Sequence, residues 1–264
     1  MPRQRVVKVF DLQGNVVEKV TLPPAFATPI RPDVIKRAVL SIQSSRLQPQ
    51  GRDLLAGKKT SAESRGTGLG ISRVPRVKGG GGRAAFAPGT VKGRQAHPPK
   101  SAKRIVKKLP KKEKKLALLS AIAATASKET VKARGHVVDD VPQIPLVVTE
   151  NIEALTKTKD VEEAFVRLGL FSDVCRVKES RKVRAGKGKM RGRRTKQGVG
   201  PLLVVAEDRG VAAAAKNIPG VDVATVGSLN AELLSPGSHP GRLTLWSTRA
   251  LDHLRKAFNS DGEA

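Results

Sequence analysis

Apolar and polar positions in the N-terminal part of the chain follow the spacing of short strands and one helix. Clusters of β-branched apolar residues indicate two strands, at 6–10 and 16–20, joined by a turn at 12–15. A helix is expected over 32–44, because Pro32 suits a first helical turn and the apolar positions behind it share one face. The N-terminal part therefore begins as strand, turn, strand and helix.

Beyond residue 110 the pattern changes to continuous apolar runs separated by helical stretches. One helix begins near Pro110, a second is expected to be capped by Thr158 and ended by Gly169, a third covers 209–217, and a fourth follows the last strand. The inward-facing residues expected in the first, second and fourth of these helices are Leu116, Leu119, Ala123, Ala126, Val161, Ala164, Phe165, Leu168, Leu251, Leu254 and Phe258. The expected strands are 145–148, 174–177, 202–206, 221–226 and 243–246. Apolar strands separated by helices are typical of an α/β domain, with a mainly parallel sheet and helices on both faces.

Residues 46–104 show neither a helical nor a strand period. Eleven glycines fall between Gly51 and Gly93, including the run 79–82. A structureless segment of this length points to a function or to disorder. We therefore expect one discontinuous α/β body, residues 1–45 and 105–264, and a long irregular extended loop, residues 46–104. As an extended hairpin, the loop could reach at most roughly 95 Å from the α/β body.

Charge is concentrated in two segments of this chain, whose formal net charge is +27. Residues 46–112 hold 18 Lys and Arg but only two acids, and residues 176–198 hold 11 Lys and Arg but only one acid. The rest of the chain is nearly neutral. Solvated surfaces normally mix both signs, so these segments predict a polyanionic partner. Nucleic acid is favoured. An anionic membrane surface is a distant second, because we find no long apolar span and no basic amphipathic helix.

The composition of these segments favours folded RNA or duplex over single strands. Arginine offers phosphate a rigid bidentate fork, lysine adds a mobile charge, and glycine lets the backbone approach closely. Aromatic residues make up only 3% of the chain, and tyrosine is absent. Single-strand platforms need aromatic side chains. We therefore expect contacts with phosphates, sugars and the shape of the RNA.

The cysteine content and the N-terminal residues indicate in which cellular compartment the protein resides. The single cysteine, Cys175, excludes an internal disulfide framework and fits a reducing compartment. We interpret Cys175 as a small buried apolar residue within the strand 174–177. The stretch Met1–Arg5 leads into no signal-peptide core, which favours the cytoplasm.

The chain carries no recognisable pattern for catalysis, cofactors or metals. A phosphate-binding loop of the form G-x-x-x-x-G-K-[ST] does not occur, and the glycines of 66–70 lie outside any strand–helix context. Four scattered histidines show no metal-ligand spacing, and no nucleophile–base pattern is visible. We expect no cofactor, no metal and no enzymatic activity.

Several segments resemble one protein family. They are Lys59–Gly68 (KTSAESRGTG), Arg73–Gly81 (RVPRVKGGG), Ala96–Lys100 (AHPPK), Ser120–Ala126 (SAIAATA), Ala185–Arg193 (AGKGKMRGR) and Pro240–Thr244 (PGRLT). The chain resembles the large-subunit ribosomal proteins of the universal L-four family in their archaeal and eukaryotic form. It is most similar to archaeal members, because it lacks the C-terminal extension of eukaryotic ones.

The resemblance implies a role, a location and a set of partners. It implies an α/β body on the outer surface of the large ribosomal subunit, in the cytoplasm. It implies a loop that passes through large-subunit rRNA to the wall of the polypeptide exit tunnel and supports assembly. Neighbouring ribosomal proteins would include the L-twenty-two family protein, and the nascent peptide would be a transient partner. No membrane is implied.

The candidate site residues follow from the charge pattern together with this resemblance. The candidate rRNA-binding residues are Lys58, Lys59, Arg65, Arg73, Arg76, Lys78, Arg83, Lys92, Arg94, His97, Lys100, Lys103, Arg104, Arg181, Arg184, Lys187, Lys189, Arg191, Arg193 and Arg194. The candidate tunnel-lining residues are Arg65, Gly66, Thr67, Gly68 and Arg73.

Two positions depart from the family pattern. Relatives usually carry an aromatic residue where this chain has Arg65, and a tyrosine where it has Thr195. Stacking on a base at position 65 would have to use the guanidinium plane.

The rival functions are an RNA-modifying or RNA-cleaving enzyme and a free RNA-binding regulator. An enzyme would need a cleft with perturbed titrating groups, whereas the cationic segments contain only three acids.

Overall fold

The computed structural model describes residues 5–79 and 81–259. The chain divides into two compact units: unit 1, made of 1–43 and 108–264, and unit 2, made of 44–107. Most of the stretch Met1–Arg5, which bears on the signal-peptide prediction, and one glycine of the run 79–82 lie outside the described residues. Unit 1 contains a sheet and a core, whereas unit 2 is built mostly from turns.

Unit 1 is organised around a sheet that has six strands within the described residues, in the order β2-β1-β5-β10-β8-β9. The strands are β1 (Val6–Phe10), β2 (Val16–Thr21), β5 (Leu146–Val148), β8 (Leu202–Val205), β9 (Asp222–Thr225) and β10 (Thr244–Ser247). Only β1 and β2 pair antiparallel, and every other neighbouring pair is parallel. Strands β5, β8 and β10 are buried along their whole length, as expected where both faces of a parallel sheet are covered. The predicted mainly parallel sheet is confirmed.

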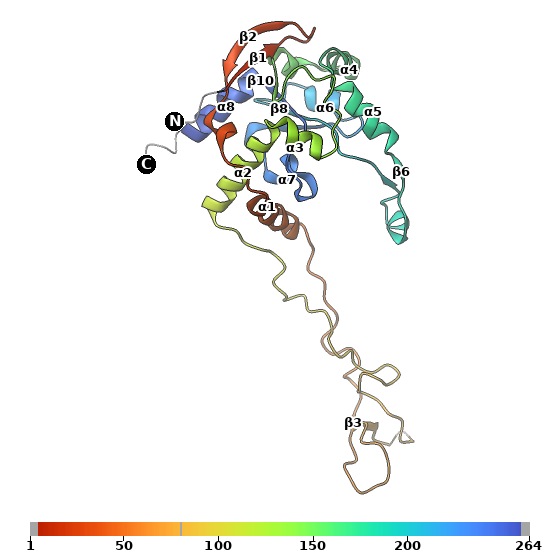
Figure 1. The fold of residues 1–264 in the computed structure, drawn as a ribbon. Coiled ribbons are helices and arrows are strands. Elements are labelled where there is room, and N and C mark those ends of the chain that lie inside the picture. Colours follow the sequence, from red (N-terminus) through yellow and green to blue (C-terminus); the bar gives the residue numbers. More distant parts are fainter. Residues whose placement is uncertain (1–4, 80, 260–264) are drawn as a thin grey trace. The chain divides into compact units, whose positions relative to one another are not determined.

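Helices cover both faces of this sheet and bury two apolar clusters (Figure 1). The helices are α1 (Pro32–Ser45), α2 (Lys111–Thr125), α3 (Lys128–Ala133), α4 (Thr158–Arg167), α5 (Phe171–Glu179), α6 (Val211–Ala215), α7 (Ala231–Leu234) and α8 (Thr248–Asn259). On β10, Trp246 joins the cluster formed with α1, α2, α7 and α8, while Leu245 joins the cluster formed with α3 to α6. Successive side chains of a strand point to opposite faces, so the two clusters lie on the two sides of the sheet.

The predicted strand at 174–177 is wrong, because these residues belong to helix α5. Val174 and Val177 are one helical turn apart and both are buried, so the apolar pair marks a helix face rather than a strand. Cys175 is accordingly only half-buried, not enclosed as expected.

Two helix starts differ from the predicted ones. Thr158 is the first residue of α4, and the capping position is Lys157, whose side chain makes no capping hydrogen bond. The helix expected from 209 begins later, at Val211, because the Asp208 carboxylate accepts the backbone N–H groups of Gly210 and Ala212 at 3.0 and 3.1 Å. The predicted end of α4 at Gly169 is confirmed by a left-handed φ of +73° there.

Unit 2 is irregular, with one short ladder that the apolar pattern did not predict. Strands β3 (Ala62–Glu63) and β4 (Arg76–Val77) pair antiparallel, so residues 64–75 form the reversal between them. Elsewhere in the unit, the backbone N–H of Arg52 donates to the carbonyl of Pro99 at 3.1 Å. A Cβ at Gly57 would lie 2.6 Å from the backbone of residues 93–94, so only glycine allows this close approach.

Candidate nucleic-acid interface

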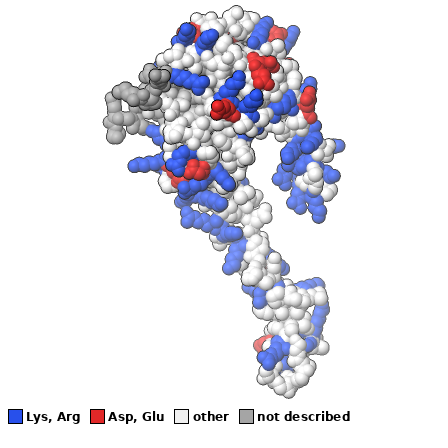
Figure 2. All heavy atoms as spheres, in the orientation of Figure 1, with Lys and Arg blue, Asp and Glu red and all other residues white. Residues whose placement is uncertain are grey.

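Most candidate RNA-binding side chains are solvent-exposed, and Lys and Arg gather visibly on the surface of both segments (Figure 2). The exposed ones are Lys58, Lys59, Arg65, Arg73, Lys78, Arg83, Lys92, His97, Lys100, Lys103, Arg104, Arg181, Lys187, Lys189, Arg191, Arg193 and Arg194. Three others, Arg76, Arg94 and Arg184, are only partly exposed. These three arginines make contacts within the protein: Arg76 and Arg184 donate hydrogen bonds to backbone carbonyls, and Arg94 lies over an aromatic ring.

The second cationic segment folds as a short hairpin that follows α5 (Figure 1). Strands β6 (Lys182–Val183) and β7 (Thr195–Lys196) pair antiparallel, with Lys182 directly opposite Lys196. Like charges facing each other across a ladder are destabilising. Within the described residues, no carboxylate forms an ion pair with any Lys or Arg of 181–196. The hairpin therefore displays cations that the rest of the protein does not neutralise.

Glycines and backbone hydrogen bonds shape the end of this hairpin. The backbone N–H groups of Arg191 and Arg193 both donate to the carbonyl of Gly188, at 3.2 Å. Gly186 and Gly192 have a φ of +76°, a left-handed conformation that side chains other than glycine adopt rarely. The turn residues are thus fixed by main-chain contacts, which leaves the basic side chains pointing to solvent.

Arg184 is partly used to close the hairpin. Its backbone N–H donates to the carbonyl of Arg194 at 2.8 Å, and its Nε donates to the carbonyl of Arg193 at 3.1 Å. A Cβ at Gly188 would lie 3.0 Å from the Arg184 Cδ. This arginine joins the two strands, unlike its fully exposed neighbours.

In unit 2, Arg65 and Arg73 lie on the reversal between β3 and β4. Both are exposed, and neither forms an ion pair within the described residues. The glycines between them, Gly66, Gly68 and Gly70, have φ values of +79°, +92° and +64°, and a Cβ on any of the three would meet nothing within 4 Å. Backbone conformation, not crowding, therefore explains glycine at these three positions.

Two other candidates in unit 2 have partners inside the unit. The guanidinium of Arg76 donates to the carbonyl of Gly82 at 2.6 Å, and Lys78 forms an ion pair with Glu63 at 2.8 Å. Both Lys78 and Glu63 are well exposed, so this ion pair contributes little to stability.

A buried polar network lies at the base of the hairpin, and no pattern in the sequence predicts it. Asp173 on α5 is fully buried and accepts hydrogen bonds from His136 Nδ1 at 2.9 Å, the Val137 backbone at 3.0 Å and Arg176 Nε at 2.8 Å. Arg176 also donates to the carbonyl of Val199, just after β7, at 2.9 Å. The network therefore ties the segment that leaves the hairpin to helix α5.

Ionisation in this network is set by burial and by the pairing. Burial lowers the pKa of His136, and the adjacent Asp173 only partly offsets this effect. Burial alone would raise the pKa of Asp173, but hydrogen bonds from His136 and Arg176 hold it below its ordinary value. At neutral pH the carboxylate is therefore ionised and the imidazole is neutral, with its proton assigned to Nδ1.

Arg242, in the segment 240–244, is a structural cation. It is 1% exposed, and its guanidinium donates to the carbonyls of Gly200 and Leu233 at 2.9 and 3.0 Å and to Asp222 at 2.6 Å. Burial lowers the pKa of Arg242, while Asp222 opposes that effect. The side chain joins β9 to helix α7 and to the segment that precedes β8.

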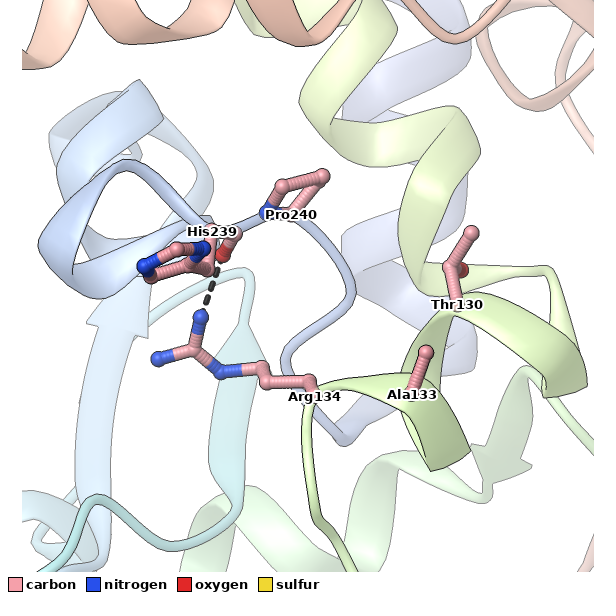
Figure 3. Close-up of a pocket in the computed structure, with 5 residues that line it drawn as sticks. All are labelled: Thr130, Ala133, Arg134, His239 and Pro240. Carbon is pink, nitrogen blue, oxygen red and sulfur yellow. Dashed lines mark hydrogen bonds between the residues drawn. The ribbon is translucent and has the colours of Figure 1, made fainter.

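A surface pocket near α3 is lined by Thr130, Ala133, Arg134, His239 and Pro240 (Figure 3). The guanidinium of Arg134 donates to the carbonyls of His239 and Pro236, the latter at 2.9 Å. Burial, together with the neighbouring cations Arg242 and Arg176, lowers the pKa of Arg134 to about 10. Its hydrogen bonds fix the 236–239 turn, so the pocket is part of the scaffold.

Metal-ligand clusters and membrane-spanning helices are both missing from the described part of the chain. Within residues 5–79 and 81–259, no three His, Cys, Asp or Glu side chains are grouped closely enough to hold a metal ion. In the same residues, no helix is both long enough and apolar enough to cross a bilayer.

Comparison with known proteins gives consistent matches along nearly the whole chain. The profile of the ribosomal protein L4/L1 family matches residues 20–257. The chain is 48% identical over 255 residues to the large ribosomal subunit protein uL4 of Methanosphaera stadtmanae, covering 97% of this chain and 98% of the relative. It is 51% identical over 247 residues to the protein of the same name from Archaeoglobus fulgidus, covering 94% and 97%. For the Sulfurisphaera tokodaii protein of that name, identity is 50% over 251 residues, covering 95% and 94%.

Proposed function

Because the chain belongs to the ribosomal protein L4/L1 family, we propose that its two cationic segments bind large-subunit rRNA and support assembly of the subunit. Family membership makes it a structural component of the large ribosomal subunit, not an enzyme. Its partners as a component of that subunit are rRNA and other ribosomal proteins.

The hairpin 181–196 is the observation that carries the proposal. Its basic side chains are exposed and no described carboxylate pairs with them, and two lysines face each other across its ladder. RNA phosphates supply the missing negative charge, because arginine and lysine donate charge-assisted hydrogen bonds to phosphate oxygens. Arg181, Lys187, Lys189, Arg191, Arg193 and Arg194 are the phosphate ligands in this proposal. Arg184 mainly shapes the hairpin that presents them.

The loop 46–104 is the second part of the proposal. We place its reversal, residues 64–75, at the wall of the polypeptide exit tunnel, near the L-twenty-two family protein, where it contacts the nascent peptide transiently. Arg65, Gly66, Thr67, Gly68 and Arg73 would line the wall. The support is the family pattern at 59–68, together with a reversal whose two arginines are exposed and lack a carboxylate partner within the described residues. The basic residues on either side of the reversal would bind rRNA.

The salt dependence of RNA affinity tests the hairpin directly. Replacing Arg181, Lys187, Lys189, Arg191, Arg193 and Arg194 with Ala, while keeping Arg184 to hold the hairpin, should weaken binding to a large-subunit rRNA transcript. It should also flatten the plot of log affinity against log salt, by roughly 0.7–0.9 slope units for each phosphate-binding side chain removed. The matched control removes six exposed lysines outside both segments: Lys19, Lys36, Lys157, Lys159, Lys216 and Lys256.

The two variants distinguish phosphate contacts made by the hairpin from a general effect of positive charge. Equal slopes for the hairpin variant and the control variant would mean that the hairpin does not contact phosphate. Loss of the cooperative unfolding transition in the hairpin variant would instead mean that the hairpin is needed to stabilise the fold. Cosedimentation of the tagged wild-type chain with large subunits distinguishes a ribosomal component from a free RNA-binding regulator, which would remain in the soluble fraction.

A further inference from the structure

Residues 85–94 of unit 2 form a tight turn closed by main-chain hydrogen bonds. The N–H of Ala87 donates to the carbonyl of Ala85 at 2.8 Å, and the N–H of Arg94 donates back to the carbonyl of Phe86 at 3.2 Å. A Cβ on Gly93 would lie 2.0 Å from the carbonyl oxygen of Ala87, so only glycine fits there. The turn therefore holds residues 86 and 94 next to each other.

Phe86 occupies an unusual backbone conformation in this turn. Its φ is +68°, in the left-handed region that a bulky side chain seldom adopts, and a hydrogen bond spans it from residue 87 to residue 85. Such a conformation is destabilising and persists only where its surroundings fix it, which happens most often at functional sites. Glycine, abundant in this unit, would occupy the position without strain. A phenylalanine there indicates that the ring itself is needed.

The ring is paired with a cation rather than buried in a core. The Arg94 guanidinium carbon lies over the Phe86 ring, 5.7 Å from its centroid, within cation–π range. Both side chains remain partly exposed. Ala85 is the one buried hydrophobic residue among the described residues of 44–107, so unit 2 has almost no apolar core for the ring to join. Local packing alone therefore does not account for the pair.

The chemistry around the pair matches a nucleotide. Phe86 is the single Phe, Trp or Tyr in residues 44–107, and no acid lies between Glu63 and Glu113. An aromatic ring and a guanidinium plane are the two protein surfaces on which a nucleobase stacks. Lys92, in the same turn, is exposed and available to the phosphate of the stacked nucleotide.

We propose that Phe86 and Arg94 form a stacking site for one unpaired base of the large-subunit rRNA, with Lys92 contacting its phosphate. This inference rests on the proposed rRNA binding and adds to it a base contact in a loop otherwise expected to bind phosphates. The base lies against the Phe86–Arg94 pair. In the ordered, RNA-bound loop, the turn at 85–94 holds the ring against that base.

Affinity and salt dependence together test the site. In full-length protein bound to a large-subunit rRNA transcript, Phe86→Leu should weaken binding about 5- to 100-fold, because leucine keeps apolar bulk but removes the stacking surface. The salt slope should stay that of the wild type, since every phosphate-binding side chain is retained. Arg94→Lys keeps the charge but not the plane, and should also weaken binding. Lys92→Ala should lower the slope by roughly 0.7–0.9 units.

Two control variants distinguish stacking from a structural role of the ring. Phe171→Leu replaces a phenylalanine that is 38% exposed on α5 and should leave affinity unchanged. Phe86→Gly relieves the backbone strain, so a purely conformational role predicts affinity equal to or above the wild type, whereas stacking predicts a loss. Wild-type affinity in Phe86→Leu or in Phe86→Gly overturns the proposal.

Crosslinking identifies what covers the pair. With p-benzoylphenylalanine at position 86 in assembled large subunits, we expect a crosslink to rRNA at an unpaired nucleotide. That nucleotide should become more reactive to base-specific chemical probes when Phe86 is leucine. A crosslink to a ribosomal protein would overturn the proposal in favour of a protein contact. Failure of the wild type to bind the transcript would instead contradict the proposed rRNA binding itself.

Discussion

At the scale of single residues, the same side-chain types serve opposite purposes in this protein. Arg191 and Arg193 point to solvent without a partner among the described carboxylates, whereas Arg242 is enclosed and donates to backbone carbonyls and Asp222. An enclosed cation is tolerated only when its donors are satisfied. Burial, rather than residue identity, therefore separates scaffold arginines from candidate RNA ligands.

The first prediction concerns Arg242. Arg242→Met should lower the free energy of unfolding by about 2–4 kcal/mol, because it leaves the buried carbonyl of Gly200 and the partly buried carbonyl of Leu233 without their donors. Arg191→Ala should change it by less than about 0.5 kcal/mol, as for an ordinary surface position. Urea denaturation measures both values. Equal stabilities of the two variants would mean that the Arg242 network does not hold the fold together.

The second prediction concerns pH and His136. Its pKa in the folded protein is lowered, so below about pH 6.5 the unfolded chain takes up a proton that the folded protein does not. Stability should therefore fall as the pH drops from 7.5 towards 5.5. The depressed pKa of Asp173 adds a further loss only at more acidic pH, as that carboxylate becomes protonated. In His136→Gln the decline between pH 7.5 and 5.5 should be shallower than in the wild type, as measured by urea denaturation. An identical decline would place its origin elsewhere.

At the scale of elements, unit 2 and the helices of unit 1 differ in what stabilises them. Helix α4 buries Val161, Ala164 and Phe165 on one face, whereas unit 2 relies on turns and a two-residue ladder. A segment that buries so little apolar surface cannot offset the entropy of ordering its backbone.

The third prediction follows for the isolated protein. Residues 46–104 should be disordered without RNA and become ordered when rRNA binds. Limited proteolysis of the free protein should therefore cut within 46–104 and leave the α/β body intact, and rRNA should suppress the cuts. Protection of this segment in the absence of RNA would contradict the prediction.

How far the elements could be predicted from sequence depended on the strength of the local pattern. The strands at 6–10 and 202–206 are predictable because both are rich in valine, and the second is a continuous apolar run. Helix α5 is not predictable from four residues, VCRV, because they fit either pattern. What distinguishes the helix is a tertiary contact, the hydrogen bond between Asp173 and His136. The Phe86–Arg94 pair was missed for a similar reason, since a turn must first bring the two residues together.

At the scale of the whole molecule, the cationic segments are separated in sequence by part of the chain that forms the body. The hairpin belongs to unit 1, and the reversal 64–75 belongs to unit 2. Charge distribution along the sequence was sufficient to identify both segments. It could not show which of their arginines remain available, because Arg76 and Arg184 find carbonyl partners only after folding.

The fourth prediction tests where the reversal lies in assembled subunits. A cysteine at position 65 or 67 should crosslink to a stalled nascent peptide, because these residues lie on the turn between β3 and β4. The same substitution at Lys103, on the returning leg of unit 2, should not. Equal labelling of both positions, or labelling of Lys103 alone, would contradict the proposed tunnel-lining role of the reversal while leaving the ribosomal identity intact.

The position of β10 in the sheet determines when the body can fold during synthesis. This strand, at 244–247, lies between β5 and β8, although it follows every other described strand in the order of translation. Before it emerges, one half-sheet holds β2, β1 and β5, the other holds β8 and β9, and each exposes an apolar edge. Both cationic segments are therefore made while their scaffold is still open, and the sheet can close only after residues 244–247 have left the ribosome that makes the chain. A nascent chain of this protein thus presents its positive charge to polyanions before its sheet is complete, and a chain that stops before residue 244 lacks the strand that joins β5 to β8.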